Sequence, residues 1–219
     1  MAMNDLSAVP SLRWRRRKEA RPAEILAAAL DEFAERGYAA ARLDRVAARA
    51  GVTKGTLYLY FPSKAELFKA VVRGALVPNI AEAERMVAQF PGRSADLLRT
   101  VLAFITQRVV DTPLSAIPKL ILAEAGNFPE LARFYRTEVI ERAFALFDAV
   151  LARGAASGEF RALGGPNVDR CIIAPILLTA MWRHSFGRFE DKSDDTAKLL
   201  ATHLDLLLNG LAARTEAAT

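Results

Sequence analysis

Apolar residues recur every three or four positions along nearly the whole chain, and this spacing limits the possible fold more than any other feature. It places apolar side chains on one face of an α-helix. Nowhere does a run of β-branched residues alternate with polar ones between turn signals, and no internal repeat is visible. The sequence therefore predicts an all-α protein.

Glycine and proline divide the helical pattern into segments. A first helix is expected from Pro22 to Gly37, because proline suits the first turn and glycine ends the periodicity. A further helix is expected to begin after Ser63, which caps it, and to reach Phe90 with a kink at Pro78. The remaining helices are expected at 93–112, 114–127, 129–157, 167–187 and 194–212.

Two short helices joined by a glycine turn lie between these segments. The first ends at Gly51, a residue suited to the left-handed conformation of a tight turn. Thr53 is a good N-cap for the second, in which Leu57 and Phe61 are four residues apart and would face inward. This arrangement is typical of a helix-turn-helix, whose second helix enters the DNA major groove.

The run ILAAALDEFAERGYAAARLDRVAARAGVTKGTLYLYFPSKAELFKAVV resembles the DNA-binding domain of the TetR family of bacterial regulators. The resemblance covers about residues 21–72 without a gap. It implies a three-helix helix-turn-helix domain joined to a helical-bundle domain for ligand binding and dimerisation. On this basis we expect a disordered basic arm at 1–20, a DNA-binding domain at 21–66, an effector-binding and dimerisation domain at 67–212, and a disordered tail at 213–219.

The exposed face of the second short helix has chemistry suited to DNA. Lysine reaches guanine acceptors or phosphates, glycine permits close approach of the backbone, and hydroxyl groups and helix N-terminal amides bind phosphate oxygens. The resemblance implies that Lys54 and Gly55 lie at base edges. It implies phosphate contacts for Thr56, Tyr58, Tyr60 and Lys64. The full set of candidate DNA-binding residues is Arg42, Thr53, Lys54, Gly55, Thr56, Tyr58, Tyr60 and Lys64.

Arg42 marks a departure from the family pattern. Thr or Ser commonly stands at the start of this helix, whereas this chain has Ala41 and Arg42. Loss of an N-cap hydroxyl typically costs about 1 kcal/mol. Arg42 either compensates by contacting DNA or points into water.

Positive charge is concentrated at the N-terminal end. Residues 1–64 contain 12 Lys and Arg against 7 Asp and Glu, whereas the rest of the chain contains 18 of each. A local basic excess is typical of phosphate binding, although a solvated charged face has the same composition. The basic cluster from Arg13 to Lys18 either reaches DNA or is a solvated tail.

The helices expected at 167–187 and 194–212 are apolar on nearly every face. Such helices must be buried all round, which a two-fold partner would achieve, so we expect a homodimer through these two helices. The resemblance also implies a small-molecule effector. Candidate effector-binding residues are Arg85, Phe104, Arg108, Glu124, Phe144, Phe147 and Trp182, although apolar members at helical spacing also fit ordinary core packing.

Other function classes find little support. The two histidines, His184 and His203, lie in apolar helices where a structural role is favoured over catalysis, and no catalytic or metal-binding motif occurs. We therefore expect no enzyme activity, no cofactor and no metal. The single cysteine, Cys171, is expected to be buried. The longest apolar run, which ends at Trp182, is shorter than the ~20 residues of a membrane span. No membrane association and a cytoplasmic location are expected.

The sequence thus predicts a transcriptional regulator, expected to be a repressor that binds double-stranded operator DNA of palindromic sequence as a homodimer. A small, largely apolar effector would release it. The alternative is a non-specific, architectural DNA-binding protein without an effector, in which the basic arm would dominate binding.

Overall fold

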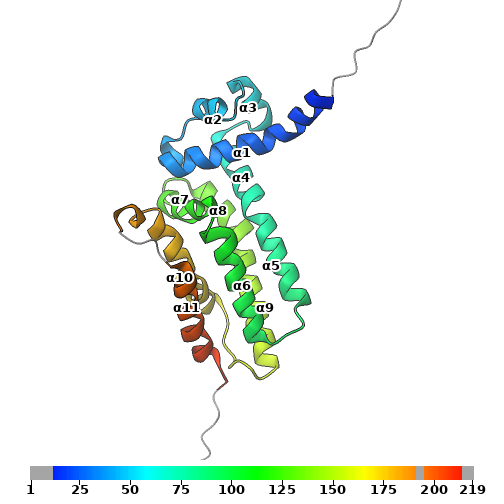
Figure 1. The fold of residues 1–219 in the computed structure, drawn as a ribbon, viewed down its shortest axis with the longest axis vertical. Coiled ribbons are helices and arrows are strands. Elements are labelled where there is room, and N and C mark those ends of the chain that lie inside the picture. The colour runs from blue at the N-terminus through cyan, green and yellow to red at the C-terminus, as the bar shows by residue number, and fades with distance from the viewer. Residues whose placement is uncertain (1–11, 191–194, 214–219) are drawn as a thin grey trace, which may run out of the picture. The chain divides into compact units, whose positions relative to one another are not determined.

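The computed structural model describes residues 12–190 and 195–213. Within these residues the chain forms helices and one isolated antiparallel bridge between Phe160 and Ala212, which confirms the predicted all-α fold (Figure 1). Every helix among them is too short or too polar to cross a bilayer. The helices are α1 (Leu12–Ala40), α2 (Leu43–Arg49), α3 (Lys54–Tyr60), α4 (Lys64–Ala75), α5 (Val77–Gln89), α6 (Ser94–Ile105), α7 (Ala116–Glu124), α8 (Pro129–Tyr135), α9 (Glu141–Ala156), α10 (Pro166–Arg183) and α11 (Thr196–Leu211), with π-helices η1 (Thr106–Val110) and η3 (Arg136–Ile140) and 3-10 helices η2 (Pro113–Ser115) and η4 (Gly187–Phe189).

The chain forms two compact units, Met1–Val71 and Val72–Thr219. We call them the N-terminal and C-terminal units. The division lies within α4, a few residues after the boundary expected at residue 66. The C-terminal tail expected to be disordered lies largely outside the described residues.

The start of the first helix differs from the prediction at Pro22. α1 begins at Leu12, so residues 12–20, which we expected in a disordered arm, are helical, and Pro22 lies inside the helix. This stretch is rich in Arg, Lys, Ala and Glu, which are good helix formers and favour continuation despite the hydrogen bond that proline removes. At Gly37 the backbone leaves helical geometry with φ of 78°, as the sequence predicted.

An aromatic cluster forms the centre of the N-terminal unit. The ring centroids of Phe33 and Phe68 are 5.3 Å apart, and Tyr38 lies 5.4 Å from Phe68. Val46 of α2 and Leu57 of α3 are fully buried as well. The two short helices are therefore held against α1 and α4 by one apolar core.

In the C-terminal unit, α5, α6 and α9 lie side by side, and α10 and α11 pack together (Figure 1). Their buried side chains form one core that includes Leu102, Phe147 and Ile172. Two helices change to π geometry without interruption, at η1 after α6 and at η3 between α8 and α9. Single π turns of this kind are frequent at functional sites.

Candidate DNA-binding surface and effector domain

The turn between α2 and α3 has the predicted helix-turn-helix geometry. Gly51 has φ of 63°, the left-handed conformation that favours glycine. The amide of Val52 then donates to the carbonyl of Ala47 at 3.0 Å. Thr53 caps α3 as predicted, because its side-chain oxygen accepts a hydrogen bond from the amide of Thr56 at 3.1 Å. This turn fixes the direction in which α3 leaves the core.

The two faces of α3 differ sharply. Leu57 is buried in the core, as predicted, and Phe61 is partly buried at the end of the helix. Lys54 and Tyr58 share the outer face, with the Lys54 ammonium 5.9 Å from the Tyr58 ring centroid. Leu59 is 85% exposed and adds an apolar contact surface that the sequence analysis did not single out.

The remaining α3 candidates are placed as follows. The hydroxyl oxygens of Thr53 and Thr56 are 2.9 Å apart, so these groups hydrogen-bond each other. Tyr60 is half-buried, with its ring centroid 6.4 Å from that of Phe61. At Gly55, an added Cβ would meet only the Thr53 hydroxyl oxygen, at 3.9 Å. Packing within the unit therefore does not require glycine at this position.

Lys64 has a structural role that the sequence did not indicate. Its ammonium donates to the carbonyls of Ala39 at 2.9 Å and Ala41 at 3.2 Å, and lies 4.9 Å from the Tyr38 ring centroid. The predicted phosphate contact therefore competes with bonds that stabilise the turn between α1 and α2.

The N-terminus of α2 lacks a side-chain cap, as predicted. Glu32, which is fully buried in α1, partly replaces it by accepting a hydrogen bond from the Arg42 amide at 3.3 Å. The Arg42 guanidinium pairs with Asp44, with Nε to Oδ1 at 3.1 Å and Nη2 to Oδ2 at 2.7 Å. This bond lowers the pKa of the Asp44 carboxyl. Sequence reasoning missed both acidic residues, although an aspartate in the first turn of a helix is a recognisable signal.

A second polar contact joins α2 to α1. The Arg49 guanidinium donates to both carboxylate oxygens of Glu35, with Nη1 to Oε1 at 2.8 Å, and its Nη2 lies 3.6 Å from Oε2 of Glu32. The bond to Arg49 lowers the pKa of Glu35. Both ends of α2 are therefore tied to α1, which limits movement of the helix-turn-helix.

Comparison with known proteins identifies this arrangement. The family described as bacterial regulatory proteins, tetR family, matches residues 25–71, the stretch that contains α2 and α3. Over 157 residues the chain is 32% identical to the DNA-binding transcriptional repressor TetR of Mycobacteroides abscessus, a match that covers 72% of this chain and 77% of that protein. The chain belongs to the TetR family. It is a DNA-binding transcriptional regulator with a helix-turn-helix.

Two further relatives extend the comparison. The chain is 30% identical over 142 residues to the HTH-type transcriptional regulator RutR of Escherichia coli strain K12, covering 64% of this chain and 54% of RutR, about half of that protein's length. The crystal structure of FadR from Bacillus subtilis in complex with stearoyl-CoA superposes with a TM-score of 0.73 at 22% identity, covering 86% of this chain and 98% of that one. At this identity the likeness concerns the fold.

In this TetR-family chain, the seven predicted effector-binding residues occupy different environments. Phe104 and Arg108 lie together, with the guanidinium carbon 5.7 Å from the ring centroid, at the junction of α6 and η1. Phe147 is fully buried in the core, and Phe144 is half-buried one turn earlier. Ordinary core packing therefore accounts for Phe147, whereas the pair of Phe104 and Arg108 lies nearer the surface.

Each of the other three candidates has a polar partner close to it in the sequence. Arg85 is exposed and forms an ion pair with Glu82 on the same helix. Glu124 accepts a hydrogen bond from the Asn127 side chain at 3.4 Å. Trp182 is partly exposed and donates to Glu190 at 2.6 Å.

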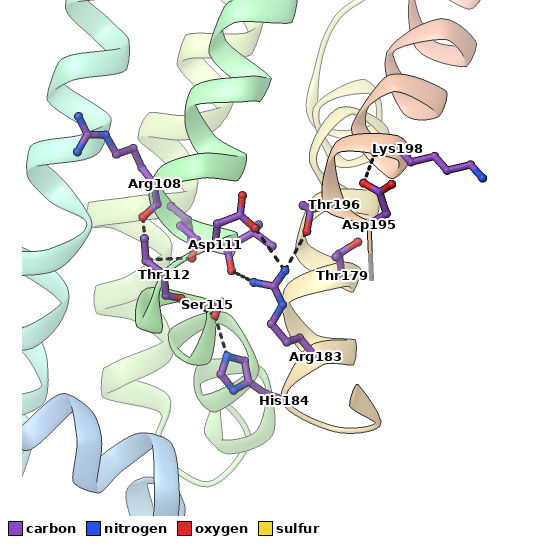
Figure 2. Close-up of polar contacts among 12 residues, drawn as sticks. Arg108, Asp111, Thr112, Ser115, Thr179, Arg183, His184, Asp195, Thr196 and Lys198 are labelled. Carbon is purple, nitrogen blue, oxygen red and sulfur yellow. Dashed lines mark hydrogen bonds and ion pairs between the residues drawn. The ribbon is translucent and has the colours of Figure 1, made fainter. Parts of the chain in front are cut away.

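Arg183 joins the end of α10 to two other segments (Figure 2). Its guanidinium donates to the Val110 carbonyl, to Asp111 at 3.3 Å and to the Thr196 hydroxyl at 2.9 Å. The next residue, His184, hydrogen-bonds the Ser115 hydroxyl at 2.7 Å (Figure 2). These contacts tie the π-helix η1 and the turn after it to α10 and α11.

Both histidines form hydrogen bonds within the C-terminal unit, which are compatible with the structural role expected of them. Burial, together with the charges of Lys119 and Arg183, lowers the pKa of His184 and favours its neutral form. His203 lies 2.8 Å from the Ile172 carbonyl through Nε2. The predicted burial of Cys171 is wrong, because this residue is exposed. It lies on the part of α10 that does not face the core of its own chain.

Large apolar side chains of α10 and α11 are left open to solvent in the single chain. On α10 they include Leu178 and Trp182, and on α11 Leu206, which is 68% exposed. The ring of Trp182 packs on Phe186, with centroids 4.7 Å apart, and Phe186 is exposed as well. Large exposed apolar side chains gathered on two helices are typical of protein–protein contacts.

Proposed function

We propose that this TetR-family regulator is a repressor that binds a palindromic operator as a homodimer and is released by a small, largely apolar effector. The observation that carries the proposal is the outer face of α3, which presents Lys54, Gly55 and Tyr58 from a helix whose other face is locked into the core. A helix in the major groove needs this combination of a fixed position and exposed polar groups.

Within this proposal, α3 reads the operator and its surroundings bind phosphate. Lys54 donates to base acceptors, while the backbone at Gly55 approaches the bases. Phosphate oxygens are bound by the hydroxyl groups of α3, the amides at its N-terminus near Thr53 and the ammonium of Lys64. The hydroxyl donors are Thr56, Tyr58 and Tyr60.

The dimer forms through α10 and α11. Leu178, Trp182 and Leu206 are exposed on these two helices, and a two-fold partner would bury them. The symmetric dimer then presents two copies of α3 to successive major grooves, about 34 Å apart. An operator with two-fold sequence symmetry follows from this arrangement.

The effector acts on the C-terminal unit, within residues 85–186. Support comes from Phe104 and Arg108, an aromatic and a cationic group placed together at a π-helix. The FadR structure of the same fold holds stearoyl-CoA, which combines a long apolar chain with anionic groups. Acyl thioesters are therefore one class to test alongside aromatics. A tenfold loss of operator affinity requires about 1.4 kcal/mol of coupling between the two sites.

The DNA-binding part is tested by selecting sequences from a random duplex library and measuring affinity for the selected site. Enrichment of a two-fold symmetric sequence is expected. If each dimer neutralises about eight phosphates, the logarithm of affinity falls with the logarithm of salt concentration with a slope near −7. Equal binding of selected and random duplexes at about 150 mM salt would contradict sequence-specific recognition and favour an architectural role.

The effector part is tested by a thermal-shift screen of fatty acids, acyl thioesters, aromatic compounds and antibiotics on the full chain. Each stabilising compound is then added to the protein–operator complex. We expect at least one compound to raise the melting temperature and to weaken operator binding tenfold or more. Compounds that bind without changing operator affinity would count against an effector-released repressor. A matched test uses Arg108→Ala, which is expected to weaken the response to an anionic effector and to leave DNA binding unchanged.

A further inference from the structure

The backbone of Arg42 is fixed by a hydrogen bond to another helix. Its amide donates to Oε1 of Glu32, which is fully buried in α1. The turn before it is anchored from α4, where the Lys64 ammonium donates to the carbonyls of Ala39 and Ala41. The start of α2 is therefore fixed against two other helices of the N-terminal unit.

The guanidinium of Arg42 is held as well. Asp44 accepts hydrogen bonds from Nε and Nη2, which form the side edge of the planar group. Oδ1 of Asp44 also accepts a hydrogen bond from the Arg45 amide at 2.9 Å, so the carboxylate is fixed to the backbone of α2. In the described part of the chain, the pair leaves the end edge of the guanidinium, between Nη1 and Nη2, directed away from Asp44.

The end edge of a guanidinium presents two parallel N–H groups. They match the O6 and N7 acceptors of guanine in the major groove, which is the commonest specific contact of arginine with DNA. An arginine that is already oriented loses less side-chain freedom when it binds a base. The charge of Lys54, the first residue of α3, adds to the effect of Arg42 in lowering the pKa of Asp44.

A contact with a base explains the pair of Arg42 and Asp44 better than fold stability or phosphate binding does. The two side chains are 65% and 43% exposed, and exposed ion pairs contribute little to stability. A phosphate contact needs charge more than orientation, and the Asp44 carboxylate would repel a phosphate beside it. A two-pronged contact with a base edge, by contrast, depends on the orientation of the guanidinium that Asp44 imposes.

We propose that Asp44 positions Arg42 to read a guanine in the operator, so that Arg42 determines specificity at one base pair of each half-site. This inference rests on the proposed function and adds a second base-reading element, at the start of α2, to the recognition helix α3. Arg42 is the specificity-determining residue, and Asp44 is a positioning residue that acts through it.

The test measures discrimination, defined as the affinity for the selected operator divided by the affinity for the same operator with one G·C pair changed to A·T in each half-site. Each G·C pair is tested in turn. At one of them we expect about tenfold discrimination by the wild-type protein. Arg42→Lys keeps the charge but replaces the two parallel N–H donors by a single ammonium group, and should reduce this value at least threefold.

Asp44→Asn leaves a single acceptor oxygen, so the side-on pair is lost. Discrimination at the same base pair should fall at least threefold, whereas affinity for random DNA stays equal or rises slightly. Asp31→Asn is the matched control, because Asp31 is an exposed aspartate of α1 in the same unit. This control changes the charge equally and should leave discrimination intact. In an Arg42→Lys background, Asp44→Asn should have no further effect on discrimination.

A base analogue separates a base contact from a phosphate contact. Replacing the identified guanine by 7-deazaguanine removes the N7 acceptor and leaves the phosphates unchanged. Wild-type affinity should fall severalfold, and that of Arg42→Lys should fall less. The inference is overturned if wild-type discrimination survives Arg42→Lys, if Asp44→Asn matches Asp31→Asn, or if 7-deazaguanine has no effect. In those cases the selected operator still supports the proposed function, whereas failure to select any sequence overturns both.

Discussion

The recognition helix and the last two helices expose side chains of opposite character. α3 presents a lysine, a glycine and hydroxyl groups, with Leu59 as its exposed apolar side chain, whereas α10 and α11 present Leu178, Trp182 and Leu206. Polar groups that are fixed but still exposed suit DNA, which is itself polar and charged. Exposed leucine and tryptophan on a helix suit a protein surface of the same kind.

Buried carboxyl groups also have different environments in the two units. Glu32 in the N-terminal unit accepts the Arg42 amide and lies near Arg49. Asp169 in α10 is fully buried, and neither of its carboxylate oxygens has a hydrogen-bond partner among the described residues. In the N-terminal unit a buried carboxyl group thus joins two helices, whereas in the C-terminal unit a buried carboxyl group without a partner destabilises the single chain.

The largest effect is expected from Leu206→Glu, which tests whether the apolar surface of α11 is a dimer contact. Burying an unpaired carboxylate costs several kcal/mol, so the dimer dissociation constant should rise at least 100-fold, to an extent measured by sedimentation velocity. The monomer should stay folded because Leu206 contributes little to the core of its own chain. Operator affinity should fall with it.

Leu59→Glu is the matched control for that experiment. Leu59 is an exposed leucine on α3, so the same substitution there should leave the sedimentation coefficient unchanged while weakening DNA binding. Equal dissociation by both variants would show that the two apolar surfaces do not differ in the way proposed.

Asp169→Asn should stabilise the protein at neutral pH. Burial, reinforced by the charge of Asp148, raises the pKa of Asp169 from 3.8 to about 6. Below pH 3.8, Asp169 is protonated in both the folded and the unfolded protein and does not lower the free energy of unfolding. As the pH rises to about 6, the unfolded state loses this proton more readily than the folded state, so the free energy of unfolding falls. A shift of this size corresponds to about 3 kcal/mol in the free energy of unfolding. The neutral amide should recover most of it above pH 6, as measured by urea denaturation.

Below about pH 4 the wild-type protein and Asp169→Asn should be nearly equal in stability. The control is Asp205→Asn, at an exposed aspartate of α11, for which the change should be within about 0.5 kcal/mol at every pH. If Asp169→Asn destabilises the protein at pH 7, the carboxylate has a partner that a single chain does not provide, and the contrast with Glu32 disappears.

Lys54→Ala and Tyr58→Phe should impair DNA binding in different ways, because one side chain is expected at bases and the other at a phosphate. The lysine change should cost about 1 to 3 kcal/mol on the selected operator and relax the base preference. The tyrosine change should weaken all sequences by the same smaller factor. Equal losses on selected and random duplexes for both variants would remove the distinction between base and phosphate contacts on α3.

Local features of the helix-turn-helix could be predicted from the sequence. The conformation of Gly51, the cap at Thr53 and the missing cap at Arg42 each depend on a few neighbouring residues. The contacts that hold this site could not be predicted in the same way. Glu32 reaches the Arg42 amide across ten residues, and Lys64 reaches Ala39 across 25, so their roles appear only when the helices are packed.

In the C-terminal unit the helices were predictable but the environments of single residues were not. Apolar spacing indicated α10 and α11, yet it did not show that Cys171 faces away from the core or that Phe147 lies inside it. A helix that is apolar all round has no polar face by which sequence alone can orient it. The start of α1 was missed because proline indicated a helix start while good helix formers continued on both sides of it.

The smallest effect on stability, and the sharpest separation of folding from binding, is expected for Gly55→Ala. A Cβ at this position meets only the Thr53 hydroxyl at 3.9 Å, and the residue lies in the first turn of α3. Because alanine favours helix more than glycine does, the free energy of unfolding should rise by up to about 1 kcal/mol. The added methyl group points toward the surface expected to face DNA, so operator affinity should fall although the fold is more stable. Thermal denaturation and operator titration on the same preparation measure both effects. A Gly55→Ala protein that binds operator as well as the wild type would show that the bases do not approach the backbone here.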